Sequence, residues 1–153
     1  MTVWVVRHAK AGSRRAWSGE DGRRPLSKPG RRQANALVAL LASESFDRIV
    51  SSPFVRCFET VEPLAASASF EVELDDRLAE DAGPYGALAL VRETAATGGV
   101  LCSHGDVIPQ LLARLERSGI DIGPDPRCEK GSVWALDLDG EEVVSARYLP
   151  PPT

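Results

Sequence analysis

Short apolar runs alternate with amphipathic helical patterns along most of this chain, and that alternation limits the folds it can adopt. Residues 2–7 (TVWVVR) and 100–102 (VLC) are too short for helices and strongly apolar, so we expect buried strands. One helical pattern has apolar residues at i, i+3, i+4 and i+7: Ala34, Leu37, Val38 and Leu41. Strands that alternate with helices predict an α/β fold, here a three-layer α/β/α sandwich around a mostly parallel sheet.

A second strand and a helix are predicted in the middle of the chain. Residues 46–51 (FDRIVS) have the composition of a strand. Ser52 and Pro53 are residue types preferred at the N-cap and first position of a helix. Pro63 lies inside the helical pattern that follows, and we expect it to kink or split that helix because it lacks a backbone donor.

The second half of the chain continues the alternation and ends in a hairpin. We expect, in order, a strand at 70–74, an acidic loop at 75–84, a helix at 86–97, the strand at 100–102, a helix after Asp106, a loop at 118–131, and a hairpin of 132–138 with 142–148. Asp139-Gly140 is a typical two-residue hairpin turn.

The composition favours one ordinary cytoplasmic domain, residues 1–153. This length can bury a sizeable core. The net charge of −4 argues against a nucleic-acid-binding surface. No apolar run approaches the roughly 20 residues that a membrane helix needs, and Arg7 interrupts any signal-peptide core. Three widely spaced cysteines indicate reduced thiols.

Positive charge is concentrated near the N-terminus of this acidic chain. Residues 8–28 show no period, are rich in Gly, Arg and Ser, and predict a long loop before a helix that begins at Arg31, after Pro29-Gly30. Nine basic residues fall in the first 32 positions: Arg7, Lys10, Arg14, Arg15, Arg23, Arg24, Lys28, Arg31 and Arg32. Any anion site of this protein is therefore expected to draw on this region.

The two histidines of the chain each follow a predicted buried strand. His8 comes directly after residues 2–7, and His104 follows the run at 100–102 after one serine. The carboxyl ends of parallel strands meet at one sheet edge, where α/β proteins bind ligands. Arg7 ends the first strand, and Arg56 lies one turn into the helix that follows the second strand, so we expect all four side chains to converge at this edge.

Such a cluster suits phosphoryl transfer. Guanidinium groups bind phosphate oxygens bidentately, and an unprotonated imidazole is a nucleophile toward phosphorus. A leaving alkoxide needs a proton donor, and Glu80 and Asp81 are the candidates. Taken alone, His8 is more often structural than catalytic; its joint placement with the other three residues favours catalysis. Zinc binding by the two histidines and Cys128 has no supporting spacing.

These residues resemble the histidine phosphatase superfamily, also called the phosphoglycerate-mutase-like family. Arg7-His8-Ala9-Lys10 resembles its Arg-His-Gly signature, and the Ala9-Lys10 variant is similar to the short SixA-like branch. Three further segments resemble family motifs: Arg24–Ser27 with Gly30, Gln33 and Ala34; Ser51–Pro53 with Arg56 and Thr60; and Ser103–Gly105. Four motifs in the right order are a specific signal.

The resemblance implies a phosphoglycerate-mutase-like fold and a role for each matched residue. His8 would carry the phosphoryl group, and Arg7, Arg56 and His104 would form the phosphate pocket. Glu80 would be the proton donor, with Asp81 as its alternative. Two further basic residues are expected at the outer pocket: Lys10 and Arg14. No metal or cofactor is implied.

The first 45 residues also resemble the phosphatase-like domain of some actinobacterial Nudix fusion hydrolases. The shared pieces are residues 7–14, a tryptophan (Trp17), residues 19–21 and residues 24–26. This resemblance brings phosphorylated nucleotides into consideration. Four arginines would then be available for additional phosphates: Arg14, Arg15, Arg23 and Arg24.

The sequence therefore predicts a metal-independent phosphatase that acts on a phosphomonoester or phosphohistidine through a covalent intermediate at His8. Its substrate would be a phosphorylated small molecule or a phosphoprotein. A mutase that returns the phosphoryl group to a second acceptor is the alternative within the family. A catalytically weak phosphate-binding or interaction module is the alternative from another class.

Overall fold

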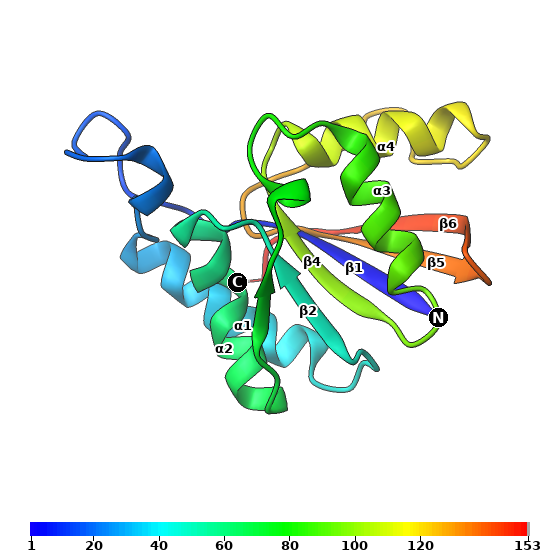
Figure 1. Ribbon diagram of the computed structural model, residues 1–153, viewed down its shortest axis with the longest axis horizontal. Helices are drawn as coiled ribbons and strands as arrows, with labels where there is room; N and C mark the ends of the chain where they lie inside the picture. Colours follow the sequence, from blue (N-terminus) through cyan, green and yellow to red (C-terminus); the bar gives the residue numbers. More distant parts are fainter. Residues whose placement is uncertain (153) are drawn as a thin grey trace.

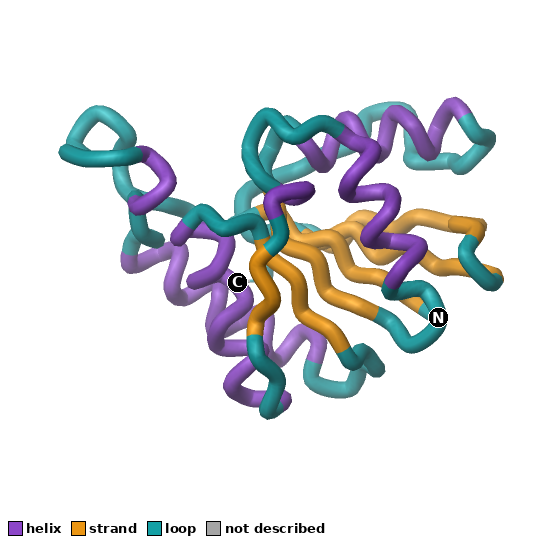
Figure 2. Tube along the Cα trace, in the orientation of Figure 1, coloured by secondary structure: helices purple, strands orange, loops and turns teal. Residues whose placement is uncertain are grey.

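A single six-stranded sheet organises the protein, whose computed structural model describes residues 1–152 (Figures 1 and 2). The strands are β1 (Thr2–Arg7), β2 (Arg48–Ser51), β3 (Val72–Leu74), β4 (Gly99–Ser103), β5 (Val133–Asp139) and β6 (Glu142–Leu149). Their order is β3-β2-β4-β1-β5-β6. The first four in this order run parallel, whereas β5 pairs antiparallel with β1 and with β6. The predicted mostly parallel α/β fold is thereby confirmed.

Four helices cover the two faces of the sheet (Figure 1). They are α1 (Lys28–Leu41), α2 (Val55–Ala68), α3 (Pro84–Glu93) and α4 (Val107–Arg117). In β1, Val3 and Val5 pack with α3 and α4, while Trp4 and Val6 pack with α1 and α2. Successive side chains of a strand point to opposite faces, so one continuous apolar run contributes to both halves of the core.

The start of α2 differs from the prediction. The helix begins at Val55 with Phe54 at the N-cap, so Ser52 and Pro53 lie before it. The Ser52 hydroxyl faces His104 and also accepts from the Phe54 N–H. Of the two predicted effects of Pro63, a kink or a split, the split is wrong because Pro63 lies within one uninterrupted helix.

Other boundaries shift by a few residues. Helix α1 begins at Lys28, one turn earlier than predicted, because Ser27 caps it and accepts from the Gly30 N–H at 3.2 Å. Helix α3 spans Pro84–Glu93 instead of 86–97. Two predicted loops contain short 3-10 turns at Asp21–Arg23 and Asp76–Leu78. The predicted terminal hairpin is confirmed, with Gly140 at a φ of 60° in its turn.

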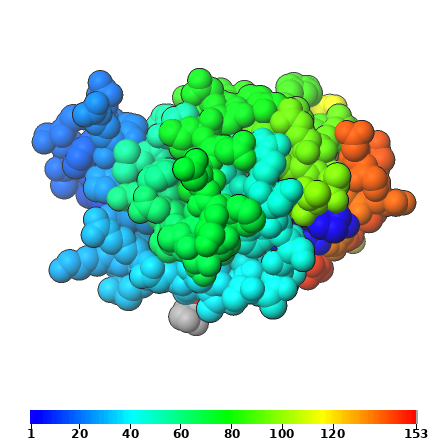
Figure 3. All heavy atoms as spheres, turned by 60° about the horizontal axis from the view of Figure 1, so that its bottom comes forward, coloured from blue at the N-terminus to red at the C-terminus, as the bar shows by residue number. Residues whose placement is uncertain are grey.

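The long loop between β1 and α1 projects from the body of the molecule (Figures 1 and 3). We call residues 12–24 the arm. Its base is closed by a bridge between Ala11 and Leu26 and by a hydrogen bond from Gly12 N–H to Pro25 O. Among residues 1–152, no helix has the length and apolar character needed to cross a membrane.

Candidate active site

The central pairing of β1 with β4 brings the two histidines together. Arg7 pairs with Ser103 at the carboxyl ends of these strands, so the residues that follow, His8 and His104, leave the sheet side by side. The His8 backbone N–H donates to Ser103 O at 3.0 Å. The ring centroids of His8 and His104 are 5.5 Å apart, and both residues are buried. The sequence-based prediction that the two histidines meet at one edge of the sheet is confirmed.

The hydrogen bonding of His8 selects the nitrogen that can act as a nucleophile. Its Nδ1 lies 2.8 Å from Ala9 O. A carbonyl oxygen can only accept, so Nδ1 carries the proton and Nε2 of the neutral ring keeps its lone pair. His8 is therefore fixed in the tautomer that presents Nε2 to a ligand.

The environment of His8 also keeps its ring uncharged. Burial is the main cause that lowers the pKa of His8, and electrostatic interactions with His104, Arg56 and Arg7 lower it as well. The hydrogen bond to Ala9 O opposes these effects, and the pKa falls from 6.5 to about 3. At neutral pH the ring is a free base, as nucleophilic attack requires.

His104 is held by the segment that precedes α2. Its Nε2 lies 2.9 Å from Ser52 Oγ and 3.5 Å from Cys57 Sγ, and Phe54 packs edge-on against its ring. Because Ser52 Oγ already accepts from the Phe54 N–H, its own proton is available to Nε2. Nδ1 of His104 then carries a hydrogen that can be donated to a ligand.

Arg56 is the most buried charged residue of the site, with 1% of its surface exposed. Its Nη1 donates to Asp21 O at 3.0 Å, and its Nη2 contacts Asp21 Oδ2 at 3.1 Å and Glu80 Oε2 at 3.3 Å. The guanidinium also lies over the Phe54 ring at 4.9 Å. These contacts fix its plane at the start of α2.

Arg7 completes the cationic group. Its Nη1 donates to Cys128 O at 2.6 Å, and its guanidinium lies flat against Gly105. A Cβ at position 105 would lie 2.6 Å from Arg7 Cζ, so only glycine allows this approach. The glycine of the second-histidine motif thus serves to position Arg7.

Three nitrogens of these residues are buried and have no hydrogen-bond partner among residues 1–152. They are Arg7 Nε, Arg56 Nε and His104 Nδ1. Buried donors in native proteins nearly always have a partner, so each orphan needs an explanation. All three lie on residues grouped around His8, where unpaired donors suit the binding of an anion.

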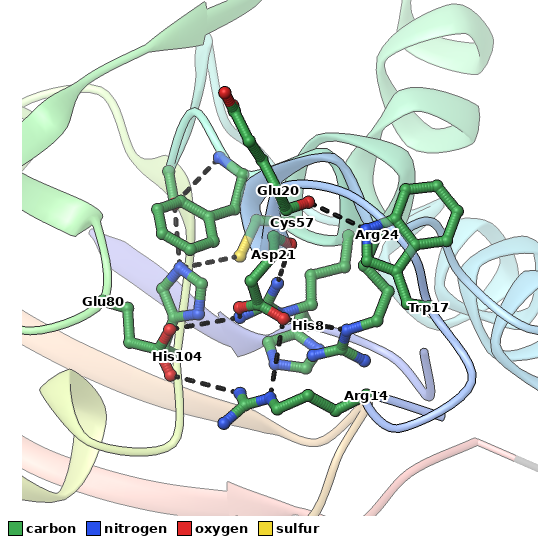
Figure 4. Close-up of polar contacts among 12 residues, drawn as sticks. His8, Arg14, Trp17, Glu20, Asp21, Arg24, Cys57, Glu80 and His104 are labelled. Carbon is green, nitrogen blue, oxygen red and sulfur yellow. Dashed lines mark hydrogen bonds and ion pairs between the residues drawn. The ribbon is translucent and has the colours of Figure 1, made fainter. Parts of the chain in front are cut away.

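The structure distinguishes between the two candidate acids. Glu80 faces Arg56 and Arg14, with Oε1 3.6 Å from Arg14 Nη2 (Figure 4). Asp81 is exposed, and its backbone N–H donates to Asp106 Oδ2. Of these two candidates, Glu80 is therefore the one whose carboxylate lies at Arg56 and Arg14.

The two predicted outer residues lie in different places. Arg14 belongs to the arm and reaches Asp21 and Glu80 at the mouth of the site (Figure 4). Lys10 instead lines a groove of ≈ 650 Å³ with Arg32, Lys130 and the prolines near the C-terminus. Lys10 is thus not brought into contact with Arg56 or Glu80.

Asp21 is a residue of the site that sequence reasoning missed. Its carboxylate meets three arginines, Arg56, Arg24 and Arg14, at 3.1, 3.0 and 3.5 Å (Figure 4). Hydrogen bonding from Arg24 and the charge of Arg56 outweigh desolvation and lower the pKa of Asp21. The sequence signals were the acidic pair Glu20-Asp21 among the arginines of a long loop, with Asp21 three residues before Arg24, and the resemblance that covers residues 19–21.

Lys130, in the loop before β5, was also missed. Desolvation and the charges of nearby arginines, of which Arg7 has the largest effect, lower the pKa of Lys130.

Within residues 1–152, no three His, Cys, Asp or Glu side chains are grouped so as to hold a metal ion.

The chain matches a family model and is similar to solved and curated proteins. Residues 3–93 match the histidine phosphatase superfamily (branch 1). The chain is similar to a solved SixA protein histidine phosphatase complexed with tungstate, with a TM-score of 0.76 and 18% identity over 97% of this chain and 94% of that one. It is also 25% identical to a phosphohistidine phosphatase SixA homolog of Haemophilus influenzae, over 81% of this chain and 84% of that protein.

A higher identity is found with a longer protein. The chain is 39% identical, over 99% of its length, to an 8-oxo-(d)GTP phosphatase of Mycolicibacterium smegmatis. It covers 48% of that protein, so it spans about half the length of this relative. With the family model matched over more than half of its residues, the chain belongs to branch 1 of the histidine phosphatase superfamily.

Proposed function

We propose that this protein is a phosphatase that hydrolyses phosphorylated substrates without a metal, through a covalent phosphohistidine at His8. One observation carries the proposal: a neutral, buried His8 lies among three buried N–H groups that have no partner among residues 1–152. A phosphoryl group bound to them would place phosphorus against Nε2 of His8. Arg7, Arg56 and His104 would neutralise charge on its oxygens, the task for which metal ions serve elsewhere.

In the first step, Nε2 of His8 forms a bond to phosphorus while the bond to the leaving oxygen breaks. The leaving oxygen takes a proton from the Glu80 carboxyl group. In the structure, Nη2 of Arg56 is shared between Asp21 and Glu80. A bound phosphoryl group would bring negative charge to Arg56 and compete with these carboxylates. Glu80 would then give up part of its ion pairing and be free to act as the acid.

In the second step, water attacks the phosphorus of the phosphohistidine. The Glu80 carboxylate accepts a proton from this water, the nitrogen–phosphorus bond breaks, and His8 is restored as phosphate leaves. Glu80 thus returns to its protonated form, and the cycle balances without a further reactant.

We infer that the substrate is a phosphorylated nucleotide. The support is the 39% identity to the 8-oxo-(d)GTP phosphatase, which extends over nearly all of this chain. The name of that longer protein describes its whole length, of which this chain matches 48%. The assignment of a nucleotide substrate to this chain is therefore part of the proposal. Phosphohistidine on a protein is the second candidate, and the resemblance to the SixA homolog favours it.

The test is turnover of p-nitrophenyl phosphate with EDTA present. We expect the His8→Ala variant to lose roughly 10³-fold or more of kcat/KM. Arg117→Ala, an exposed change in the last turn of α4, should match the unaltered protein. Equal turnover by the His8→Ala protein would refute the proposal. Release of phosphate in equal amount to nitrophenol separates hydrolysis from transfer to a second acceptor.

A further inference from the structure

The arm carries an exposed tryptophan in a fixed position. Trp17 is 37% exposed, whereas Trp4 and Trp134 are 5% and 2% exposed. Its indole Nε1 donates to Glu20 O at 2.8 Å, and its backbone N–H donates to Ser13 O at 3.1 Å. One edge of the ring is therefore held by the arm while much of the ring remains in contact with solvent.

The arm itself is tied to the catalytic arginine. Arg24, which is 7% exposed, donates from Nη1 to Gly12 O at 2.6 Å and so closes the arm at its base. Arg24 also contacts Asp21, which in turn contacts Arg56 through both its carboxylate and its backbone oxygen. The position of Trp17 is thus linked to the phosphate-binding end of α2.

A hollow of ≈ 740 Å³ adjoins the Trp17 ring. It is lined by Trp17, Ser18, Gly19, Glu20, Arg23 and Val55. This volume lies in the range of small-molecule sites. Val55 immediately precedes Arg56, and Glu20 and Arg23 flank Asp21, so the hollow borders the catalytic pocket through two separate segments.

An exposed basic side chain lies at the edge of the site, where the arm meets Asp21 and Glu80. Arg14 contacts Asp21 at 3.5 Å and Glu80 at 3.6 Å, and 67% of its side chain is exposed. In Figure 4, Trp17 and Glu80 lie on opposite sides of Asp21, with Arg14 spanning the side below. A ligand at His8 that extends toward the arm would therefore have the exposed Arg14 guanidinium beside it.

We propose that this hollow binds the base of a purine nucleoside diphosphate whose terminal phosphoryl group lies at His8. The base stacks on Trp17, and Arg14 pairs with the inner phosphate. Any purine base can stack on an aromatic ring, whereas a phosphohistidine substrate has no base that could stack on Trp17. This inference rests on the proposed nucleotide phosphatase function and names the residues that would select the leaving group.

The first measurement follows the emission of Trp17 in the His8→Ala protein, which binds without turnover. GDP should quench this emission, whereas ribose 5-phosphate, which lacks a base, should not. The same titration on a His8→Ala, Trp17→Phe protein gives the contribution of the two buried tryptophans. Equal quenching by both ligands, or quenching that persists without Trp17, would overturn the proposal.

The second measurement compares affinities by calorimetry. Trp17→Ala should lower the ratio of GDP affinity to ribose 5-phosphate affinity about tenfold, while Trp17→Phe should keep most of it. Leu40→Ala, another exposed apolar residue on α1, is the matched control and should leave the ratio unchanged. Melting temperatures verify that each variant is folded.

The two proposals fail in different ways. If the Trp17→Ala ratio is unchanged, or GDP does not bind, the base site is refuted even when p-nitrophenyl phosphate is still hydrolysed through His8. If His8→Ala hydrolyses p-nitrophenyl phosphate normally, the proposed catalytic route fails regardless of what binds at Trp17.

Discussion

At the scale of single residues, the main feature is an imidazole kept neutral by its surroundings. His8 has Nδ1 bound to Ala9 O and a pKa lowered to about 3, chiefly by burial. The lowered pKa keeps the nucleophile unprotonated at neutral pH, but it makes the folded protein less stable in acid. The unfolded chain takes up a proton near pH 6.5, and the folded protein does so only near pH 3.

This difference predicts how stability depends on pH. Between pH 3 and 6.5 the unfolded state binds more protons at His8, so the free energy of unfolding falls as the pH is lowered through this window. The contribution approaches about 1.4 kcal/mol per pH unit for one proton. Urea unfolding from pH 4 to 6 should show a shallower dependence for His8→Asn. The same slope in both proteins would contradict the lowered pKa.

A second residue-scale prediction concerns Gly30. A Cβ at this position would lie 1.8 Å from Lys10 O, a backbone atom that also accepts from Ser27 N–H. Gly30→Ala must therefore displace the segment that follows His8, and we expect it to lower the free energy of unfolding by about 1–3 kcal/mol. Gly22→Ala has no neighbour within 4 Å and is the control. Similar denaturation midpoints for the two variants would refute this role of Gly30.

At the scale of elements, α2 connects the catalytic parts. It presents Arg56, and Thr60 one turn later donates to Arg56 O at 2.6 Å and accepts from Ala9 N–H at 2.9 Å. Glu59 of the same helix accepts from Leu26 N–H at 2.9 Å and so fixes the end of the loop. The Arg-x-x-x-Thr spacing therefore has a structural reason, which is to hold the nucleophile segment beside the arginine.

Replacement of Thr60 by valine tests this link. The change keeps the shape but leaves the Ala9 N–H buried without an acceptor, at a cost of about 1–3 kcal/mol. It should also lower kcat, because Ala9 O orients His8. Thr94→Val is the matched control: Thr94 is equally buried but only donates, to Leu90 O and Val91 O. Unchanged kcat and stability in Thr60→Val would contradict the account.

The elements also show what the sequence could and could not predict. Strands and helices followed from periodicity, and the convergence of Arg7, His8, Arg56 and His104 followed from their places next to strand ends. The start of α2 was mispredicted because Ser52 bonds to His104 instead of capping the helix. Asp21 was missed because only the folded arm brings it to three arginines, and no local pattern encodes that path.

At the scale of the whole molecule, one sheet joins both halves of the core. Val5 packs with α3 and α4, and its neighbours Trp4 and Val6 pack with α1 and α2. Because each central strand contributes to both faces, loss of either layer of helices would expose one apolar face of the sheet that supports the other layer.

We therefore expect residues 1–153 to unfold as one cooperative domain. Trp134 packs on the α3 and α4 face and Trp4 on the opposite face, so single-tryptophan versions report each half. Their fluorescence transitions in urea should coincide with the loss of helical circular dichroism. Separate midpoints for the two tryptophans would show that the halves are independent.

The central claim is that the phosphoryl group passes through His8. The most direct measurement is rapid acid-free quenching of the enzyme during turnover of p-nitrophenyl phosphate, followed by peptide mass spectrometry. We predict phosphate on the peptide that contains His8, stable in base and lost in acid, and absent from the His8→Ala protein. Phosphate on another residue, or steady turnover with no phosphorylated His8 even in a Glu80→Gln variant that slows its hydrolysis, would contradict the account.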